Sequence, residues 1–236
     1  MNTCNLLTDL LRSELFALTL VMGSYLLGIF LYKRLKLPII QPLLISMIII
    51  IVFLKTTGID YSVFRNNTRF LNFMLGPSVV ALGYVLYEQI YYLKGNIISI
   101  LTAVFVGCIV GIVSVVGIAK LMGTDIQMLF SLAPKSVTTP IAISIAKNNH
   151  GIPELAVVFV IICGIFGGAV GPIVLRYLNI KSKVAKGLAM GTASHALGTV
   201  RAIEMGATEG AISGLAIGIM GIMTAMVMPF IEKILN

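Results

Sequence analysis

Six long stretches of the chain contain no Asp, Glu, Lys or Arg, and they constrain the fold more than any other feature of the sequence. They cover residues 15–32, 37–54, 70–87, 95–119, 155–175 and 210–231. A helix needs about 20 apolar residues to cross the hydrocarbon core of a bilayer. Because these stretches fill more than half of the 236 residues, no room remains for a soluble catalytic domain. The sequence therefore predicts a single integral membrane domain over residues 1–236, all-α, with about 6–8 spans.

The net charge of +8 agrees with a membrane protein. The Lys and Arg residues lie mainly between the apolar stretches, for example in 33–36 and 176–186. Short cationic loops beside spans set the orientation of a membrane protein. No basic face with interleaved aromatic residues occurs, so nucleic acid is not an expected partner. Cys4, Cys108 and Cys163 lack metal-ligand spacing, and we expect neither a metal site nor a cofactor.

Two segments interrupt the pattern of plain apolar spans. Residues 131–147 read SLAPKSVTTPIAISIAK, and residues 189–205 read AMGTASHALGTVRAIEM. Both are rich in hydroxyl residues and in Gly or Pro, yet apolar spans flank them. Backbone that leaves the helix at membrane depth is tolerated only where protein surrounds it or where it lines a wet cavity. We therefore expect at least two broken or re-entrant helices in the interior, as carriers have.

A spacing of 58 residues suggests an internal repeat. It separates Ser78 from Ser136 and Ser136 from Ser194, and a Gly-containing apolar stretch follows each serine. Chance similarity is the alternative, because identity between the copies is weak. Near Gly76 and Pro77 the first copy holds either a third break or an ordinary kinked span. The candidate units are leading spans in 15–69 and repeats over 70–123, 131–180 and 189–234.

Lys135 is the most conspicuous charge in these segments. A lysine inside a bilayer protein is costly and usually marks a substrate path or a partner. Pro140 suits the first turn of a helix whose N-cap is Thr138 or Thr139. The N-terminus of that helix, together with Lys135 and the hydroxyl of Ser136, predicts an anion site. The alternative is a hairpin tip whose lysine reaches out to water.

The second segment adds further candidate binding groups. Ser194 and Thr199 supply hydroxyl donors, Arg201 offers a planar fork for a carboxylate, and His195 is a candidate proton carrier. In the alternative interpretation Arg201 pairs with Glu204, three residues away on a helix, and His195 bonds a neighbouring helix. Both interpretations stay open at this point.

Glu204, Glu88 and Ser78 are possible coupling or structural residues. A cation or proton exchanger needs a carboxylate at mid-depth, and Glu88 and Glu204 are the acidic residues near a break, so this function ranks lower. An intramembrane hydrolase is not expected. Ser194 and His195 are adjacent and would point about 100° apart on a helix, and no G-x-S-x-G elbow occurs.

The strings LAPKSVTTPIAISIA (132–146), GTASHALGTVRAIEMG (191–206) and GPSVVAL (76–82) resemble the LrgB/CidB family. The resemblance covers nearly the whole chain and implies a multi-pass protein of the bacterial inner (plasma) membrane. Such proteins are described as antiholin-like or holin-like modulators of murein hydrolase activity and autolysis, acting with an LrgA/CidA-type membrane protein. They are also described as monocarboxylate carriers, and the plastidial glycolate/glycerate translocator resembles a fusion of both components. The positions that match the family's motifs are Lys135, Ser136, Thr138, Thr139, Ser194, His195, Thr199 and Arg201.

We therefore expect a membrane carrier for a small organic anion such as pyruvate or glycolate, with Lys135 and Arg201 as charge partners. A homodimer or larger oligomer is expected, because one chain of this size offers little static scaffold for a moving site. The alternative is an antiholin-like or holin-like modulator of murein hydrolase export and autolysis that acts with an LrgA/CidA-type partner.

Overall fold

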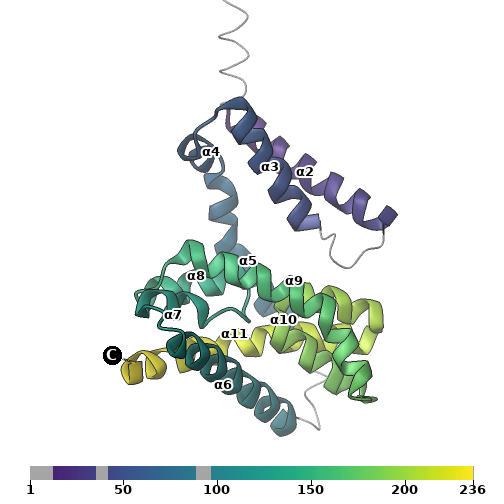
Figure 1. Cartoon of the computed structure of the whole chain (residues 1–236). Helices are drawn as coiled ribbons and strands as arrows, with labels where there is room; N and C mark the ends of the chain where they lie inside the picture. Colours follow the sequence, from purple (N-terminus) through teal and green to yellow (C-terminus); the bar gives the residue numbers. More distant parts are fainter. Residues whose placement is uncertain (1–12, 36–41, 89–96, 236) are drawn as a thin grey trace, which may run out of the picture. The chain divides into compact units, whose positions relative to one another are not determined.

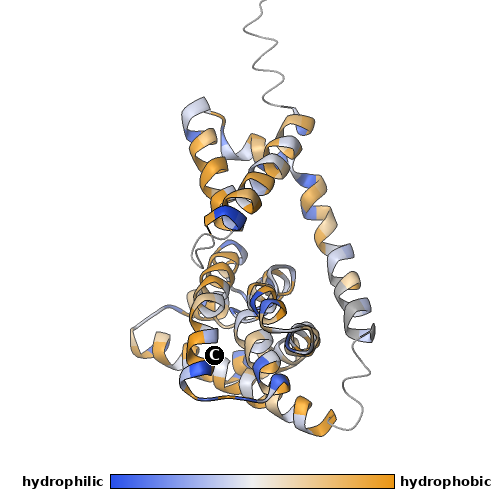
Figure 2. Cartoon of the chain, turned by 90° about the vertical axis from the view of Figure 1, so that its right-hand side faces the viewer, coloured by the Kyte–Doolittle hydropathy of each residue, from blue (hydrophilic) through white to orange (hydrophobic). Residues whose placement is uncertain are grey.

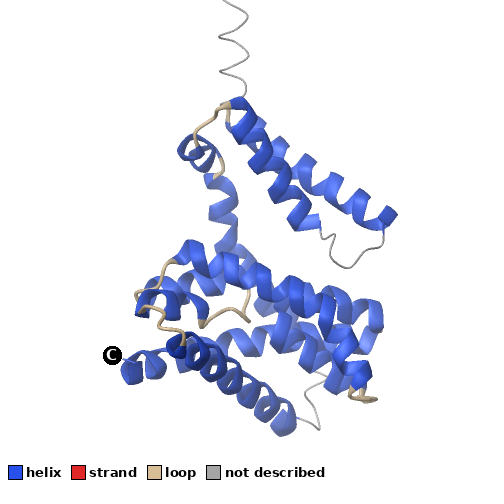
Figure 3. Cartoon of the chain, viewed as in Figure 1, coloured by secondary structure: helices blue, strands red, loops and turns tan. Residues whose placement is uncertain are grey.

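The computed structural model describes residues 13–35, 42–88 and 97–235, and in these ranges the chain contains helices and no strand (Figures 1 and 3). The all-α prediction is therefore confirmed for the described part of the chain. The helices are α2 (Glu14–Leu35), α3 (Pro42–Thr57), α4 (Tyr61–Asn67), α5 (Arg69–Glu88), α6 (Ile97–Leu121), α7 (Ile126–Leu132), α8 (Thr139–Asn148), α9 (Pro153–Tyr177), α10 (Lys183–Met205) and α11 (Ala207–Leu235).

Four of the described helices, α2, α6, α9 and α11, are long and apolar enough to cross a membrane. Most of their residues are hydrophobic (Figure 2). Helix α3 is apolar but has only 16 residues, and α5, which covers the predicted span 70–87, is not among the four. The membrane-protein character is thus confirmed, and the total of 6–8 spans stays a prediction.

The chain divides into two compact units between Pro77 and Ser78, inside α5. In the first unit α2 packs against α3, and the buried hydroxyls of Ser24 and Ser46 lie 2.7 Å apart across that contact. Helix α5 continues through Gly76 and Pro77, so this segment is an ordinary helix and not a third break. Ser78 lies inside α5. Glu88 ends it, and the side chain of Glu88 lies outside the part that the structure describes.

The second unit is built around α11, which packs against α10, α6 and α8. Its apolar core includes Val104 from α6, Val160 from α9 and Leu215 from α11, all fully buried. The thiol of Cys108 and the hydroxyl of Thr224 lie 3.5 Å apart and join α6 to α11. These small and medium side chains let the helices approach closely, as membrane helices commonly do.

The first predicted break is present between α7 and α8. Helix α7 ends at Leu132, residues 133–138 form turns without helix, and α8 begins at Thr139 with Pro140 in its first turn. Thr138 is the N-cap residue, with extended backbone, although its side chain makes no capping hydrogen bond. The Pro140 signal for a helix start is confirmed, whereas the position of this break in a bilayer stays a prediction.

The second break lies inside α10, at His195, where the backbone has φ 41° and ψ −135°. A β-carbon on Gly187 would lie 2.6 Å from the carbonyl oxygen of Glu209, and one on Gly210 would lie 3.0 Å from the Cα of Ile203. Gly187 and Ile203 therefore contact neighbouring residues of α11. In a straight helix they would be about 24 Å apart. Helix α10 thus folds back at His195, and both of its halves pack against the start of α11.

The end of α9 predicts a difference between two substitutions at Asn179, which has a left-handed backbone with φ 53°. Its N–H donates to the Arg176 carbonyl, and the N–H of Ile180 donates to the Leu175 carbonyl, each at 3.0 Å. This is a Schellman motif, whose left-handed position favours Gly or Asn. We expect Asn179→Gly to leave the free energy of unfolding of the purified protein unchanged. Asn179→Val should lower that free energy by about 1–2 kcal/mol, because a β-branched residue is strained in the left-handed conformation. Equal melting of the two variants would contradict this assignment.

Candidate functional site

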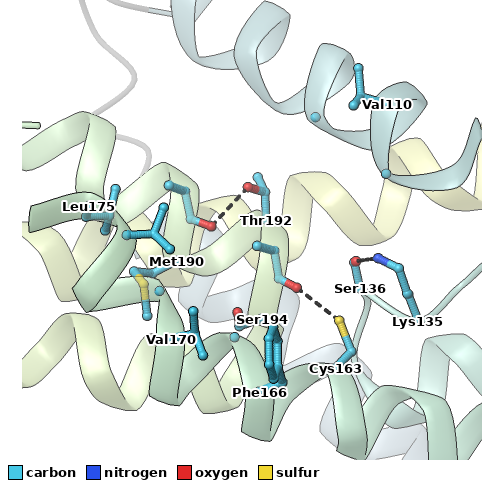
Figure 4. Close-up of a pocket in the computed structure, with 17 residues that line it drawn as sticks. Val110, Lys135, Ser136, Cys163, Phe166, Val170, Leu175, Met190, Thr192 and Ser194 are labelled. Carbon is cyan, nitrogen blue, oxygen red and sulfur yellow. Dashed lines mark hydrogen bonds between the residues drawn. The ribbon is translucent and has the colours of Figure 1, made fainter. Parts of the chain in front are cut away.

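A cavity of about 520 Å³ lies in the second unit, between α6, α9, the first half of α10 and the turn that connects α7 to α8. Lys135 and Ser136 line it from that turn, and Thr192 and Ser194 line it from α10 (Figure 4). Cys163 lines it from α9. Ser194 directly precedes the reversal of α10, so residues from both broken segments meet at one cavity.

Lys135 supplies the positive charge of the cavity. Its side chain is half-buried, and its Nζ donates a hydrogen bond to Oγ of the buried Ser136 at 3.0 Å. Among the described lining residues Lys135 is the one charged side chain, and no described carboxylate pairs with it. A half-buried ammonium in an apolar cavity loses part of its hydration, and an anion in the cavity would offset that cost.

The walls of the cavity consist mainly of glycines and apolar side chains. A β-carbon on Gly107 or Gly111 of α6 would meet no heavy atom within 4 Å, so this side of the cavity is open space. Phe166, Val170 and Met190 cover other parts of the wall (Figure 4). A compact ligand with one negative charge and an apolar body matches this combination of one cation and apolar walls.

Glycines of α9 leave the space that Ser194 and His195 occupy at the reversal of α10. A β-carbon on Gly167 would overlap Oγ of Ser194, and one on Gly164 would lie 2.5 Å from Nε2 of His195. The ring of the buried His195 is also held by α9, because its Nε2 lies 2.9 Å from the carbonyl oxygen of Val160. Close packing against α9 therefore fixes Ser194 at the cavity.

The structure brings some of the predicted site residues together and separates others. Lys135, Ser136 and Ser194 line the cavity. The remaining predicted positions are not among its described lining residues, and they are Thr138, Thr139, His195, Thr199 and Arg201. The hydroxyl oxygen of Thr138 is buried without a hydrogen-bond partner among the described residues.

The second half of α10 makes contacts within the protein. Nη1 of Arg201 lies 2.6 Å from Oε2 of Glu204, so the two residues pair across one turn of helix. The hydroxyl of Thr199 lies 2.7 Å from that of Ser213 in α11. For Arg201, Glu204 and His195 these contacts match the alternative interpretation, in which the side chains pair with each other or bond a neighbouring helix.

Sequence reasoning missed two residues that line the cavity, Thr192 and Cys163. Thr192 lies in the same polar string as Ser194, two residues away, and that spacing was a usable signal. Cys163 looked like a packing residue in an apolar stretch, and nothing in its sequence context points to a cavity.

Comparison with known proteins identifies the family. The family model described as "LrgB-like family" matches residues 21–234. The uncharacterized protein YxaC of Bacillus subtilis (strain 168) is 37% identical over 212 residues, which cover 90% of this chain and 92% of that protein. The antiholin-like protein LrgB of Bacillus mycoides (strain KBAB4) is 34% identical over 215 residues, which cover 91% of this chain and 94% of that protein. The antiholin-like protein LrgB of Bacillus cereus (strain B4264) has the same identity and coverage. No solved structure matches the chain. Since the family model and these relatives match nearly the entire sequence, the chain belongs to the LrgB-like family.

Proposed function

We propose that this chain is a multi-pass carrier of the bacterial plasma membrane for a small monocarboxylate such as pyruvate or glycolate. The observation that supports the proposal is Lys135, which has no described counter-charge and lies in an apolar cavity where two broken segments meet. Carriers commonly bind substrate where discontinuous helices meet. The hydroxyls of Ser136 and Ser194 would orient the carboxylate against the ammonium group.

The size and lining of the cavity support a monoanion. Its volume of about 520 Å³ lies in the range of small-molecule sites, which is about 300–1,000 Å³. A dicarboxylate would bring a second charge that no described lining residue compensates. A carboxylate with a short apolar or hydroxylated tail uses both the single cation and the apolar wall.

Uptake of labelled pyruvate into vesicles that contain the purified chain tests this function. The proposal expects uptake that saturates with concentration and that unlabelled pyruvate inhibits, while acetone, a neutral molecule of similar size, does not inhibit. Uptake no faster than in protein-free vesicles would contradict it. Passage of large dyes without saturation would indicate a pore instead.

A second candidate function is modulation of murein hydrolases and autolysis, since relatives at 34% identity are named antiholin-like protein LrgB. An LrgA/CidA-type membrane protein is the proposed partner, and exposed apolar residues on α2, such as Leu15 and Leu26, are available for such contacts or for self-association. This function predicts that the variant Lys135→Gln still changes autolysis in cells as the unmodified chain does. Loss of both autolysis control and uptake in that variant would tie the phenotype to transport.

Two further functions receive less support. A cation or proton exchanger needs a carboxylate at the site, and no described lining residue of the cavity is acidic. We also propose that the chain is not an enzyme. The Ser194 hydroxyl lies beside Gly167 of α9, whereas the His195 ring lies beside Gly164 and bonds the carbonyl of Val160. The two side chains are therefore not arranged as a nucleophile and its base.

A further inference from the structure

A second cavity, of about 470 Å³, lies where α9 ends and α10 begins. Three cationic side chains line it, from Arg176, Lys181 and Lys186. We call this cavity the basic cavity. Its apolar wall includes Ile180 and Met205, and no acidic residue is among its described lining residues.

Two features of the fold build the basic cavity. The Schellman motif at Asn179 turns the chain back at the end of α9 and places Ile180 against the apolar cluster that contains Leu175. The reversal of α10 at His195 returns Met205 to the level of Lys186, although 19 residues separate them in sequence. The basic cavity is therefore a consequence of the fold and not only of a cationic stretch of sequence.

The cationic groups of the basic cavity have no counter-charges in the described structure. Arg176 and Lys181 are exposed, Lys186 is half-buried, and none of them forms an ion pair with a described residue. Three like charges around one cavity repel each other, and an anion bound between them would relieve that repulsion. Guanidinium and ammonium groups are the usual protein partners of phosphate oxygens.

The basic cavity is positioned at the end of a helix long enough to span the bilayer. Helix α9 has 25 residues, and Arg176 lies in its last turn beside Tyr177, which is 88% exposed. Tyrosine is enriched at membrane interfaces, where lipid headgroups lie. Ile173, one turn before Tyr177, is also exposed and offers an apolar surface toward lipid. A ligand here would contact cationic groups at the headgroup level and apolar side chains below it.

We propose that the basic cavity binds the phosphate group of an anionic phospholipid. The three cations contact the phosphate, and the apolar wall and the exposed flank of α9 contact the glycerol and the upper acyl chain. Basic pockets between membrane helices are known to hold such headgroups. A soluble phosphate ester carries the same phosphate chemistry without the acyl chains, so the experiment includes both. The proposal does not depend on the carrier function.

Retention of lipid by the purified chain in neutral detergent tests the proposal by native mass spectrometry. Phosphatidylglycerol is added, with phosphatidylcholine and glycerol phosphate in parallel. We expect Lys186→Gln to weaken phosphatidylglycerol binding about tenfold, because the lost charge-assisted hydrogen bond contributes about 1.5 kcal/mol. The matched control is Lys183→Gln, which removes the same charge three residues away but does not line the basic cavity, and it should change binding less than twofold.

Each outcome of this experiment decides the proposal. Equal weakening by Lys186→Gln and Lys183→Gln would overturn the basic cavity as the site. Equal binding of phosphatidylcholine and phosphatidylglycerol would overturn recognition of an anionic lipid, and displacement of the lipid by equimolar glycerol phosphate would show that a free phosphate ester is the better ligand. Arg176→Gln, at an exposed position, is measured alongside with the same expected weakening, so the test stands if Lys186→Gln fails to fold.

Discussion

We expect Lys135→Gln to reduce pyruvate uptake into vesicles about 100-fold at low substrate concentration. The side chain is half-buried in an apolar cavity and has no described carboxylate partner, so a bound carboxylate would be its counter-charge. Removing a charge-assisted hydrogen bond from a carboxylate costs about 1.5–3 kcal/mol, and the upper part of this range corresponds to about 100-fold. The initial rate of uptake, normalised to the amount of inserted protein, measures the effect.

Two control variants separate the cavity from the general charge of the protein. Lys147→Gln removes an exposed charge at the end of α8, and Arg201→Gln breaks the pair with Glu204 outside the described lining of the cavity. We expect both to keep uptake within about threefold, because neither side chain is among the described lining residues of the cavity. A loss in Arg201→Gln as large as in Lys135→Gln would show that the carboxylate site extends to the second half of α10.

The second large effect is expected for Gly191→Ala, in the first half of α10. A β-carbon at this position would lie 2.8 Å from Cβ of Ala216 and 3.0 Å from Cα of Ser213, and it would also collide with the Ser213 carbonyl. Because these are atoms of the α11 backbone and of a short side chain, neither can rotate away. Overpacking of this kind costs about 1–3 kcal/mol, so the melting temperature in detergent should fall by several degrees.

The matched control is Gly107→Ala in α6, where a β-carbon would meet nothing within 4 Å. Alanine favours a helix over glycine by about 1 kcal/mol, so this variant should melt at the same temperature as the unmodified chain or higher. If Gly191→Ala melts no lower than Gly107→Ala, then α10 does not pack closely against α11 at Gly191.

The two breaks were predictable from sequence because polar residues and Gly or Pro are unfavourable in a plain lipid-facing helix. Pro140 and the neighbouring hydroxyl residues predicted a helix start with Thr138 or Thr139 as the N-cap, and in the structure Thr138 is the N-cap and α8 begins at Thr139. The same reasoning predicted an interruption in 189–205, and the backbone of His195 provides it. Local chemistry was sufficient for these two features.

The placement of the side chains was less predictable because it depends on the direction that the chain takes after His195. The fold-back of α10 carries Thr199 toward Ser213 in α11. The pair of Arg201 with Glu204 spans one turn within the helix, and the sequence offered it as an alternative. The string that contains them predicted an interruption, but it does not indicate the direction in which the chain continues after it. Cys163 likewise reaches the cavity only through the packing of α9 against α10.

The repeat prediction remains open, although two parts of the chain share an order of elements. Helices α7 and α8, with a break between them, precede the long helix α9, and the folded-back α10 precedes the long helix α11. The first copy differs, because α5 is continuous at Gly76 and Pro77. The described chain therefore does not have three equivalent breaks. The equal spacing of Ser78, Ser136 and Ser194 did not show that the first copy lacks one.

Protection of Cys163 by pyruvate is the most direct measurement of an anion site between the two breaks. Cys163 is half-buried and lines the cavity, whereas Cys108 is fully buried and provides an internal control. A small water-soluble thiosulfonate would modify Cys163, and peptide mapping would give the rate. We expect pyruvate to slow this reaction in a saturable way and Lys135→Gln to remove the protection. A modification rate at Cys163 that pyruvate leaves unchanged at every concentration would contradict it.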